Sequence, residues 1–171
     1  MHNSTYHRMS RDMRADPPAT TSPPRLWTVD EANARLPQLR ELLDQLREWA
    51  VRLSEVHGEL RRLTEFWGAE VDAADHADHH LKRRLEAEWK NLSRRIDEAI
   101  DALRAEAIDV KALDTGLVDF YSVVGGELAL LCWRRDEAEV GFYHSLTGGF
   151  RGRRPLPAPC EATTPAADLS T

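Results

Sequence analysis

Apolar residues recur at alternating spacings of three and four along two long stretches, from Leu36 to Leu60 and from Leu81 to Ala107. This spacing places them on one side of an α-helix, where they form a seam that packs against another helix. The first seam runs to about Trp67 and predicts a helix roughly 55 Å long. Because a reversal over 68–75 separates the two seams, we predict a long, coiled-coil-like antiparallel helical hairpin over residues 28–108.

The start of the first helix carries a clear signal. Thr28 is followed three residues later by Glu31, which is a capping box in which each side chain satisfies a free backbone N–H group. Pro37 lies inside the helical pattern and lacks an N–H group. We therefore expect it to bend the first turns or to split off a short helix that ends near Arg35.

The composition of the chain limits its domain organisation, its location and the partners it can bind. The chain has 171 residues, 42% of them hydrophobic and 30% charged, and a net charge of −6. We expect a disordered leader over 1–25, a single domain over 26–156 and a disordered tail over 157–171. Since neither a membrane span nor a signal peptide is visible, we expect a cytoplasmic protein, and the acidic charge argues against nucleic-acid binding. Two cysteines do not make a disulfide framework.

After Ile108 the pattern changes from helix to strand. Three runs rich in β-forming residues follow one another, separated by the turns Gly125-Gly126 and 135–138. These runs predict a three-stranded antiparallel β-meander within residues 116–150. The fold class is therefore α+β, a helical hairpin followed by a meander.

The turns also predict the register of the strands. A two-residue turn at Gly125-Gly126 places Asp119 opposite Cys132. A four-residue turn at 135–138 places Cys132 opposite Gly141, which puts His144 on the other face of the sheet, the face that the helices should cover. The residues predicted for that helix-facing side are Val118, Phe120, Leu131, Trp133, Val140 and Phe142, with Ser122, Ala129 and His144 at one end.

The pairing of Asp119 with Cys132 admits three interpretations. As a nucleophile the thiol is poorly placed, because a carboxylate disfavours the thiolate and His144, the nearest base, is predicted on the opposite face. As a divalent metal site, for zinc as an example, the pair needs further ligands from Glu137, a helix or a bulge that turns His144 over. The simplest interpretation is structural, with Asp119 accepting hydrogen bonds and Cys132 acting as a small apolar residue.

Two other clusters are candidate sites. His76 and His80, four residues apart, would share one face of a helical turn as a pair of metal ligands does, although they could equally be a solvated helix start. Near the end of the domain, Arg151, Arg153 and Arg154 follow two glycines and could hold a phosphate or carboxylate. This segment lacks the lysine and the spacing of a phosphate-binding loop.

Several blocks of the sequence together resemble the bacterial family catalogued as domain of unknown function 2203. These blocks are TVDEANARLP from Thr28, GLVDF from Gly116, LCW from Leu131, FYH from Phe142 and GFRGR from Gly149. The resemblance covers roughly residues 26–156 and supports the same layout. It carries no activity, but it implies a set of shared residues, namely Asp119, Cys132, Trp133, Glu137, His144 and Arg153.

The sequence contains no catalytic signature, so we predict a binding or assembly protein. A hairpin about twice as long as the strands should project beyond the sheet with its apolar stripe exposed, and the same stripe on a second copy would cover it. We therefore expect a homodimer. The alternative is an enzyme with a metal or anion site at the rim of the meander, built from Asp119, Cys132, Glu137, His144 and Arg153.

Overall fold

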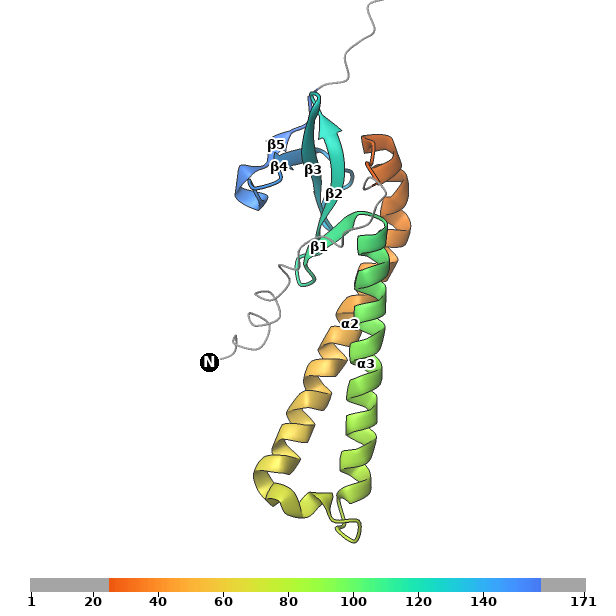
Figure 1. The fold of residues 1–171 in the computed structure, drawn as a ribbon, viewed down its shortest axis with the longest axis vertical. Coiled ribbons are helices and arrows are strands. Elements are labelled where there is room, and N and C mark those ends of the chain that lie inside the picture. The colour runs from red at the N-terminus through yellow and green to blue at the C-terminus, as the bar shows by residue number, and fades with distance from the viewer. Residues whose placement is uncertain (1–24, 158–171) are drawn as a thin grey trace, which may run out of the picture.

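A computed structural model describes residues 25–157, which form an antiparallel helical hairpin with a sheet at one end (Figure 1). The predicted leader and tail fall outside these residues, apart from Arg25 and Pro157. Along the chain the elements are α2 (Val29–Trp67), η1 (Gly68–Asp72), α3 (His79–Ala105), β1 (Ile108–Ala112), β2 (Leu117–Val124), β3 (Glu127–Arg134), β4 (Phe142–Ser145), η2 (Phe150–Gly152) and β5 (Arg154–Pro155).

Helix α2 begins where the sequence predicts. The Thr28 hydroxyl accepts from the Glu31 N–H group, and the Glu31 carboxylate accepts from the Thr28 N–H group, so the capping box is complete. The helix continues through Pro37, and the predicted split near Arg35 is wrong. Leu36 and Leu39, on either side of the proline, are both buried in the core, and this packing holds the helix together where one backbone hydrogen bond is missing.

The two helices bury most of their apolar stripe against each other. Towards the tip of the hairpin, Val56, Leu85 and Leu92 form a second cluster that is separate from the core near the sheet. The stripe predicted to remain exposed is therefore largely covered within one chain. Helix α3 has 27 residues against the 39 of α2, because the chain after Trp67 runs through η1 and a series of turns before α3 starts.

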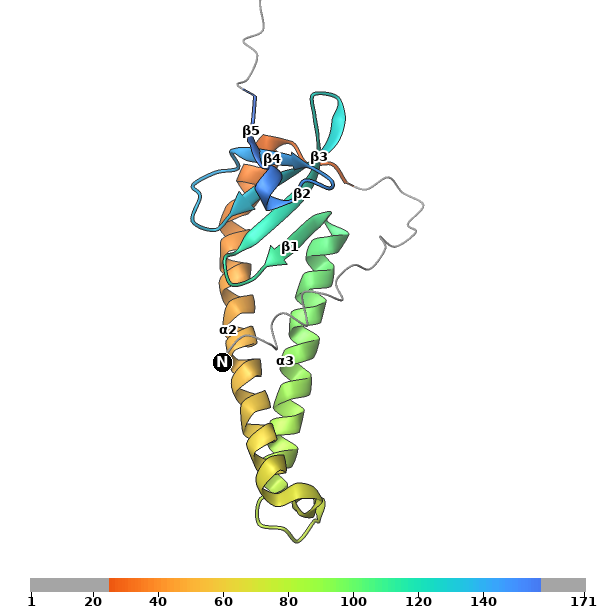
Figure 2. The same cartoon turned by 90° about the vertical axis from the view of Figure 1, so that its left-hand side faces the viewer.

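The sheet has five antiparallel strands in the order β1-β2-β3-β4-β5, and the prediction of three strands is wrong. The first missed strand, β1, has only five residues and follows directly from the end of α3 (Figure 2). Its five residues alternate apolar and polar, but so short a run directly after the helical seam is not separable from the seam by its period. The second, β5, has two residues and forms only by pairing with β4.

The β2–β3 hairpin confirms the predicted register. Val124 pairs with Glu127, and Asp119 pairs with Cys132. Gly125 and Gly126 both have positive φ angles, 63° and 84°, as a two-residue turn of this kind requires.

The predicted β3–β4 register is wrong by one residue. Cys132 pairs with Phe142 rather than with Gly141, and Leu130 pairs with His144. Because side chains alternate between the faces of a sheet, this shift turns every residue of β4 over. Phe142 therefore leaves the predicted helix-facing side, Tyr143 packs against the core in its place, and His144 moves to the face that carries Asp119 and Cys132.

One face of the sheet, called the inner face here, packs on α2. Trp133 and Phe120 are fully buried on it, and the Trp27 ring contacts the Phe120 ring edge to face at 5.4 Å. Val140 precedes β4 and is also buried in this core. Among the described residues, no helix is long and apolar enough to cross a membrane.

Candidate metal site

The other face of the sheet, the outer face, carries three adjacent side chains that can ligate a metal. Asp119 comes from β2, Cys132 from β3 and His144 from β4, so three neighbouring strands each supply one ligand. One ligand atom from each of the three lies within 4.8 Å of the other two. All three residues are buried, with exposed fractions of 2%, 0% and 2%. Among the described residues this is the one group of three such side chains.

The orientation of His144 is fixed by its backbone neighbour. Its Nδ1 atom lies 2.7 Å from the carbonyl oxygen of Ser145. A carbonyl oxygen only accepts hydrogen bonds, so Nδ1 carries the proton and donates it. In the neutral imidazole, Nε2 then presents a lone pair, and this lone pair points at the carboxylate of Asp119. Metal-binding histidines are commonly held in this way, by a carbonyl on the nitrogen that does not bind the metal.

Two lone-pair-bearing groups that face each other in a buried site need a cation between them or a proton on one of them. The Nε2 atom of His144 lies 3.3 Å from both carboxylate oxygens of Asp119. A charge-assisted N–H···O bond is shorter, about 2.7–2.9 Å. Ligand atoms bound to zinc at about 2.0–2.1 Å in a tetrahedron are separated by about 3.3–3.4 Å. The observed separation therefore matches two ligands of one zinc ion better than a protonated ion pair.

The thiol of Cys132 is held in its protonated form when no metal is bound. Burial, the negative charge of Asp119 and a hydrogen bond to Asp119 raise the pKa of Cys132 to about 12, against a smaller opposing effect of Arg153. A thiol with this pKa is a poor nucleophile, in agreement with the sequence analysis. A bound metal ion reverses the balance, because it replaces the proton and turns the thiol into a ligand.

The charges and donor types of the three residues suit a divalent transition metal. A carboxylate and a thiolate supply two negative charges and the neutral imidazole supplies none, so a divalent ion gives a site without net charge. A neutral site is far less costly to bury than a charged one. Sulfur, nitrogen and oxygen together are the ligands that Zn²⁺ takes in proteins, whereas Mg²⁺ and Ca²⁺ prefer oxygen alone.

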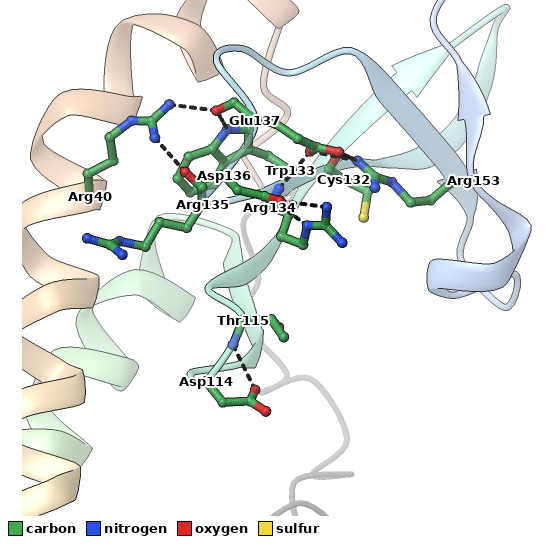
Figure 3. A network of polar contacts seen from close by, with 10 residues as sticks. All are labelled: Arg40, Asp114, Thr115, Cys132, Trp133, Arg134, Arg135, Asp136, Glu137 and Arg153. Carbon is green, nitrogen blue, oxygen red and sulfur yellow. Dashed lines mark hydrogen bonds and ion pairs between the residues drawn. The ribbon is translucent and has the colours of Figure 1, made fainter.

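A second layer of contacts holds the cysteine in place (Figure 3). Arg153 donates from Nη2 to the Cys132 carbonyl oxygen at 3.1 Å and to both carboxylate oxygens of Glu137 at 2.7 Å. Its guanidinium lies over the rings of Phe142 and Phe150. The Glu137 carboxylate therefore accepts hydrogen bonds from Arg153 and from the Arg134 N–H group. The prediction that Glu137 supplies a further metal ligand finds no support in these contacts.

The loop between β3 and β4 is fixed by contacts with α2 that the sequence analysis missed. Arg40 donates to the carbonyl oxygens of Arg135, Glu137 and Ala138, as Figure 3 shows for the first two. Asn33 accepts from the Val140 N–H group through its side-chain oxygen at 2.8 Å. These contacts hold the loop, which is a turn followed by bends, against α2 and so set the register of β4. No spacing in the sequence reveals them, because the partners are about 100 residues apart.

Trp133 is the remaining candidate site residue in this region, and its side chain contacts the same loop between β3 and β4. Its indole N–H group donates to the Glu137 carbonyl oxygen at 3.1 Å, and its ring lies 4.8 Å from the Arg40 guanidinium carbon. The side chain is fully buried on the inner face, opposite to Asp119, Cys132 and His144. Trp133 therefore positions the loop and does not contact the site.

One charged pair borders the site on the far side, on strand β1. Asp109 pairs with Asp119 across the β1–β2 ladder, and Lys111 forms an ion pair with Asp109. Burial alone would lower the pKa of Lys111, but its hydrogen bond to Asp109 and the charges of Asp109 and Asp119 raise it above its ordinary value. Lys111 therefore remains a cation next to the site.

The other candidate clusters do not assemble in the same way. His76 lies before the start of α3, which begins at His79, so His76 and His80 do not share a helical turn. The Nδ1 atom of His76 accepts from the Asp78 N–H group. Arg151 and Arg154 are exposed, while Arg153 is committed to Glu137.

The fold and the site define a class of protein, a small α+β protein whose sheet buries an Asp–Cys–His cluster on the face away from its helical hairpin. The chain belongs to the family described as an uncharacterized conserved protein (DUF2203), whose family model matches residues 25–156. This match confirms the resemblance that the sequence blocks indicate. Comparisons with the curated proteins and with the solved structures found no match.

Proposed function

We propose that this protein binds one divalent transition-metal ion, best suited to zinc, through Asp119, Cys132 and His144. The observation that carries the proposal is the geometry of His144, whose Nδ1 proton is held by Ser145 while Nε2 faces a buried carboxylate at 3.3 Å. The adjacent buried thiol supplies the third ligand. A charge-neutral, fully buried donor set supports binding of the ion more than any other function for these residues.

The ion would join the three strands β2, β3 and β4 through one side chain of each, in addition to their ladder hydrogen bonds. Binding to the folded state alone stabilises it, by about 2.7 kcal/mol when the free metal is at one hundred times its dissociation constant. Three protein ligands leave a tetrahedral ion one position for water or another small ligand. We assign this site a metal-binding role and no chemical reaction.

The test is a metal titration of the full-length protein carrying no histidine tag. We expect one Zn²⁺ per chain by elemental analysis. Co²⁺ in its place should produce a near-ultraviolet charge-transfer band, because that band requires a bond between cobalt and a thiolate. Cys132→Ser should abolish the band, and His144→Ala should weaken binding at least about 100-fold through loss of one ligand.

The chain offers two matched control variants. Cys160→Ser removes the other cysteine, and His80→Ala removes an exposed histidine of the hairpin. Both should bind metal as the parent protein does. If metal content follows His80 instead of Cys132 and His144, or if no stoichiometric metal binds, the proposal is wrong.

Two further predictions from the sequence concern the whole protein. A cytoplasmic location fits a free thiol ligand, because a reducing compartment keeps cysteine available for metal. An anion site built from Arg151, Arg153 and Arg154 finds less support, because the charge of Arg153 is already neutralised by Glu137. The predicted homodimer and its role in assembly do not depend on the metal and are developed below.

A further inference from the structure

The outer side of α2, which faces away from α3, has an unusual combination of residues. Val51 and Phe66 are exposed there, with exposed fractions of 51% and 76%. Between them lie Glu55, Gly58 and Arg62, and at 100° per residue all five residues fall on one side of the helix. We call these five residues the α2 stripe. A hollow of about 390 Å³ lies along it, lined only by residues of α2, and a second one of about 590 Å³ extends from Arg62 and Phe66 to Leu81 and Leu85 of α3.

Packing among residues 25–157 does not require a glycine at position 58. It lies in the interior of a 39-residue helix, where glycine is the least favourable residue apart from proline. A Cβ atom at this position would meet only the Nη1 atom of Arg62, at the ordinary contact distance of 3.7 Å. The chain therefore has room for alanine, and a missing side chain there is useful when a second helix approaches closely.

The stripe is complementary to itself when it is reversed. Consider an antiparallel pair of α2 helices with a two-fold axis between positions 58 and 59. Each residue then faces the residue of the other copy for which the two residue numbers add up to 117. Phe66 of one copy then faces Val51 of the other, and Arg62 faces Glu55. Arg62 makes no ion pair within the described residues, so its guanidinium is available for this contact. Each contact occurs twice, as a two-fold interface requires.

We propose that the protein forms a homodimer through the α2 stripe, with two α2 helices packed antiparallel and crossing at Gly58. A shallow crossing of about 20° keeps the helices in contact from Val51 to Phe66. The exposed Phe66 ring of each copy enters the hollow beside Val51 of the other. This arrangement buries Val51 and Phe66, two of the large apolar side chains that the hairpin exposes. It also brings Arg62 to Glu55, which contacts Arg52 within its own chain.

The first experiment measures mass in solution by sedimentation equilibrium of the full chain at micromolar concentration. We expect a dimer, and we expect Phe66→Ala to raise its dissociation constant at least about 100-fold, because the interface loses an aromatic anchor at each of its two ends. Thr64→Ala, a change on the same helix outside the stripe, is the matched control and should leave the dimer intact. A protein that stays monomeric at all concentrations overturns the proposal.

Charge reversal tests the alignment. Glu55→Arg alone and Arg62→Glu alone each place like charges opposite each other at two points, so each should weaken the dimer about tenfold or more. The double variant restores both pairs with their signs exchanged and should recover the dimer. Circular dichroism shows whether each variant keeps its helical fold. If the double variant is as weak as the single variants, the alignment is wrong.

Cysteine cross-linking locates the two-fold axis in a Cys160→Ser background. Gly58→Cys should form an interchain disulfide, because the two copies of position 58 meet at the crossing. Val51→Cys is the matched control, since its two copies lie roughly 22 Å apart along the helices and should not cross-link. A dimer that survives Phe66→Ala and does not cross-link at position 58 uses another surface, and it overturns the proposal.

Discussion

The two connections of strand β3 reach their registers by different means. The β2–β3 connection is a two-residue turn whose glycines both have positive φ angles, and the pairing of Asp119 with Cys132 follows from it. The β3–β4 connection runs over residues 135–141, and its position depends on Arg40 and Asn33 of α2. A local turn sets the first register, and tertiary contacts set the second.

The difference matters because the candidate metal site needs both registers. The β2–β3 turn brings the carboxylate and the thiol together, and the β3–β4 loop adds the imidazole. A shift of one residue in β4 would leave two ligands on the outer face and move His144 to the inner face. Metal affinity is therefore a sensitive measure of whether the β3–β4 loop is correctly docked.

The largest effect is expected from removing the docking contact. Arg40→Ala eliminates three charge-assisted hydrogen bonds to the loop and a contact with the Trp133 ring. We expect the free energy of unfolding to fall by about 2 kcal/mol, and metal affinity to fall at least about tenfold as β4 loses its support. Urea denaturation and zinc titration measure the two effects.

The control for this variant is Arg47→Ala, an exposed arginine about two turns further along the same side of α2. It should change the free energy of unfolding by less than about 0.5 kcal/mol and leave metal binding unchanged. An Arg40→Ala variant that loses stability but keeps full metal affinity would show that the β4 register does not depend on the docked loop.

A smaller effect is expected from a change of pH. It acts on Cys132, the thiol that the β2–β3 turn places beside Asp119. In the metal-free protein Cys132 has a pKa of about 12, so its thiol stays protonated throughout the neutral range and metal must displace that proton. Raising the pH therefore favours metal binding, by about tenfold in affinity for each pH unit between about pH 6 and 8. Zinc titrations with a competing chelator give the slope.

Calorimetry in buffers of different ionisation enthalpy counts the protons independently. At least one proton should be released for each Zn²⁺ bound at neutral pH. Binding that is independent of pH and releases no proton would mean that the thiol is not a ligand.

The smallest effect is expected from a substitution in the β2–β3 turn. Gly126→Ala introduces a Cβ atom that meets nothing within 4 Å, but it forces alanine to a φ angle of 84°. We expect a loss of about 1 kcal/mol in the free energy of unfolding, with metal affinity unchanged because the turn has no alternative register. Gly141→Ala, a matched control without a positive φ angle or a nearby contact, should cost less. A drop in metal affinity for Gly126→Ala would show that the turn also influences the site.

Much of the fold was predictable because its signals are local. The capping box at Thr28, the helical seams and the paired glycines each specify structure within a few residues, and the structure confirms all three. The strands β1 and β5 were missed for the opposite reason. Each is too short to show a period, and each forms because a neighbouring strand offers it hydrogen bonds.

The candidate site was predictable only in part. The pairing of Asp119 with Cys132 follows from the sequence, which leaves three sources for a further ligand: Glu137, a helix side chain or a bulge that turns His144 over. The structure turns His144 over by a different route, a longer loop instead of a bulge. The contacts of Arg40 and Asn33 responsible for it connect residues about 100 positions apart, and no pattern in one sequence reveals such pairs.

Local sequence patterns specify the two helices, the β2–β3 hairpin and the adjacency of one carboxylate and one thiol, because backbone sterics and apolar periodicity act over short distances. The tertiary structure decided which face of the sheet His144 occupies. A strand can present either face at nearly equal local cost, and only the docking of a distant loop on α2 selects between them. This selection completes the group of three residues that could hold a metal ion.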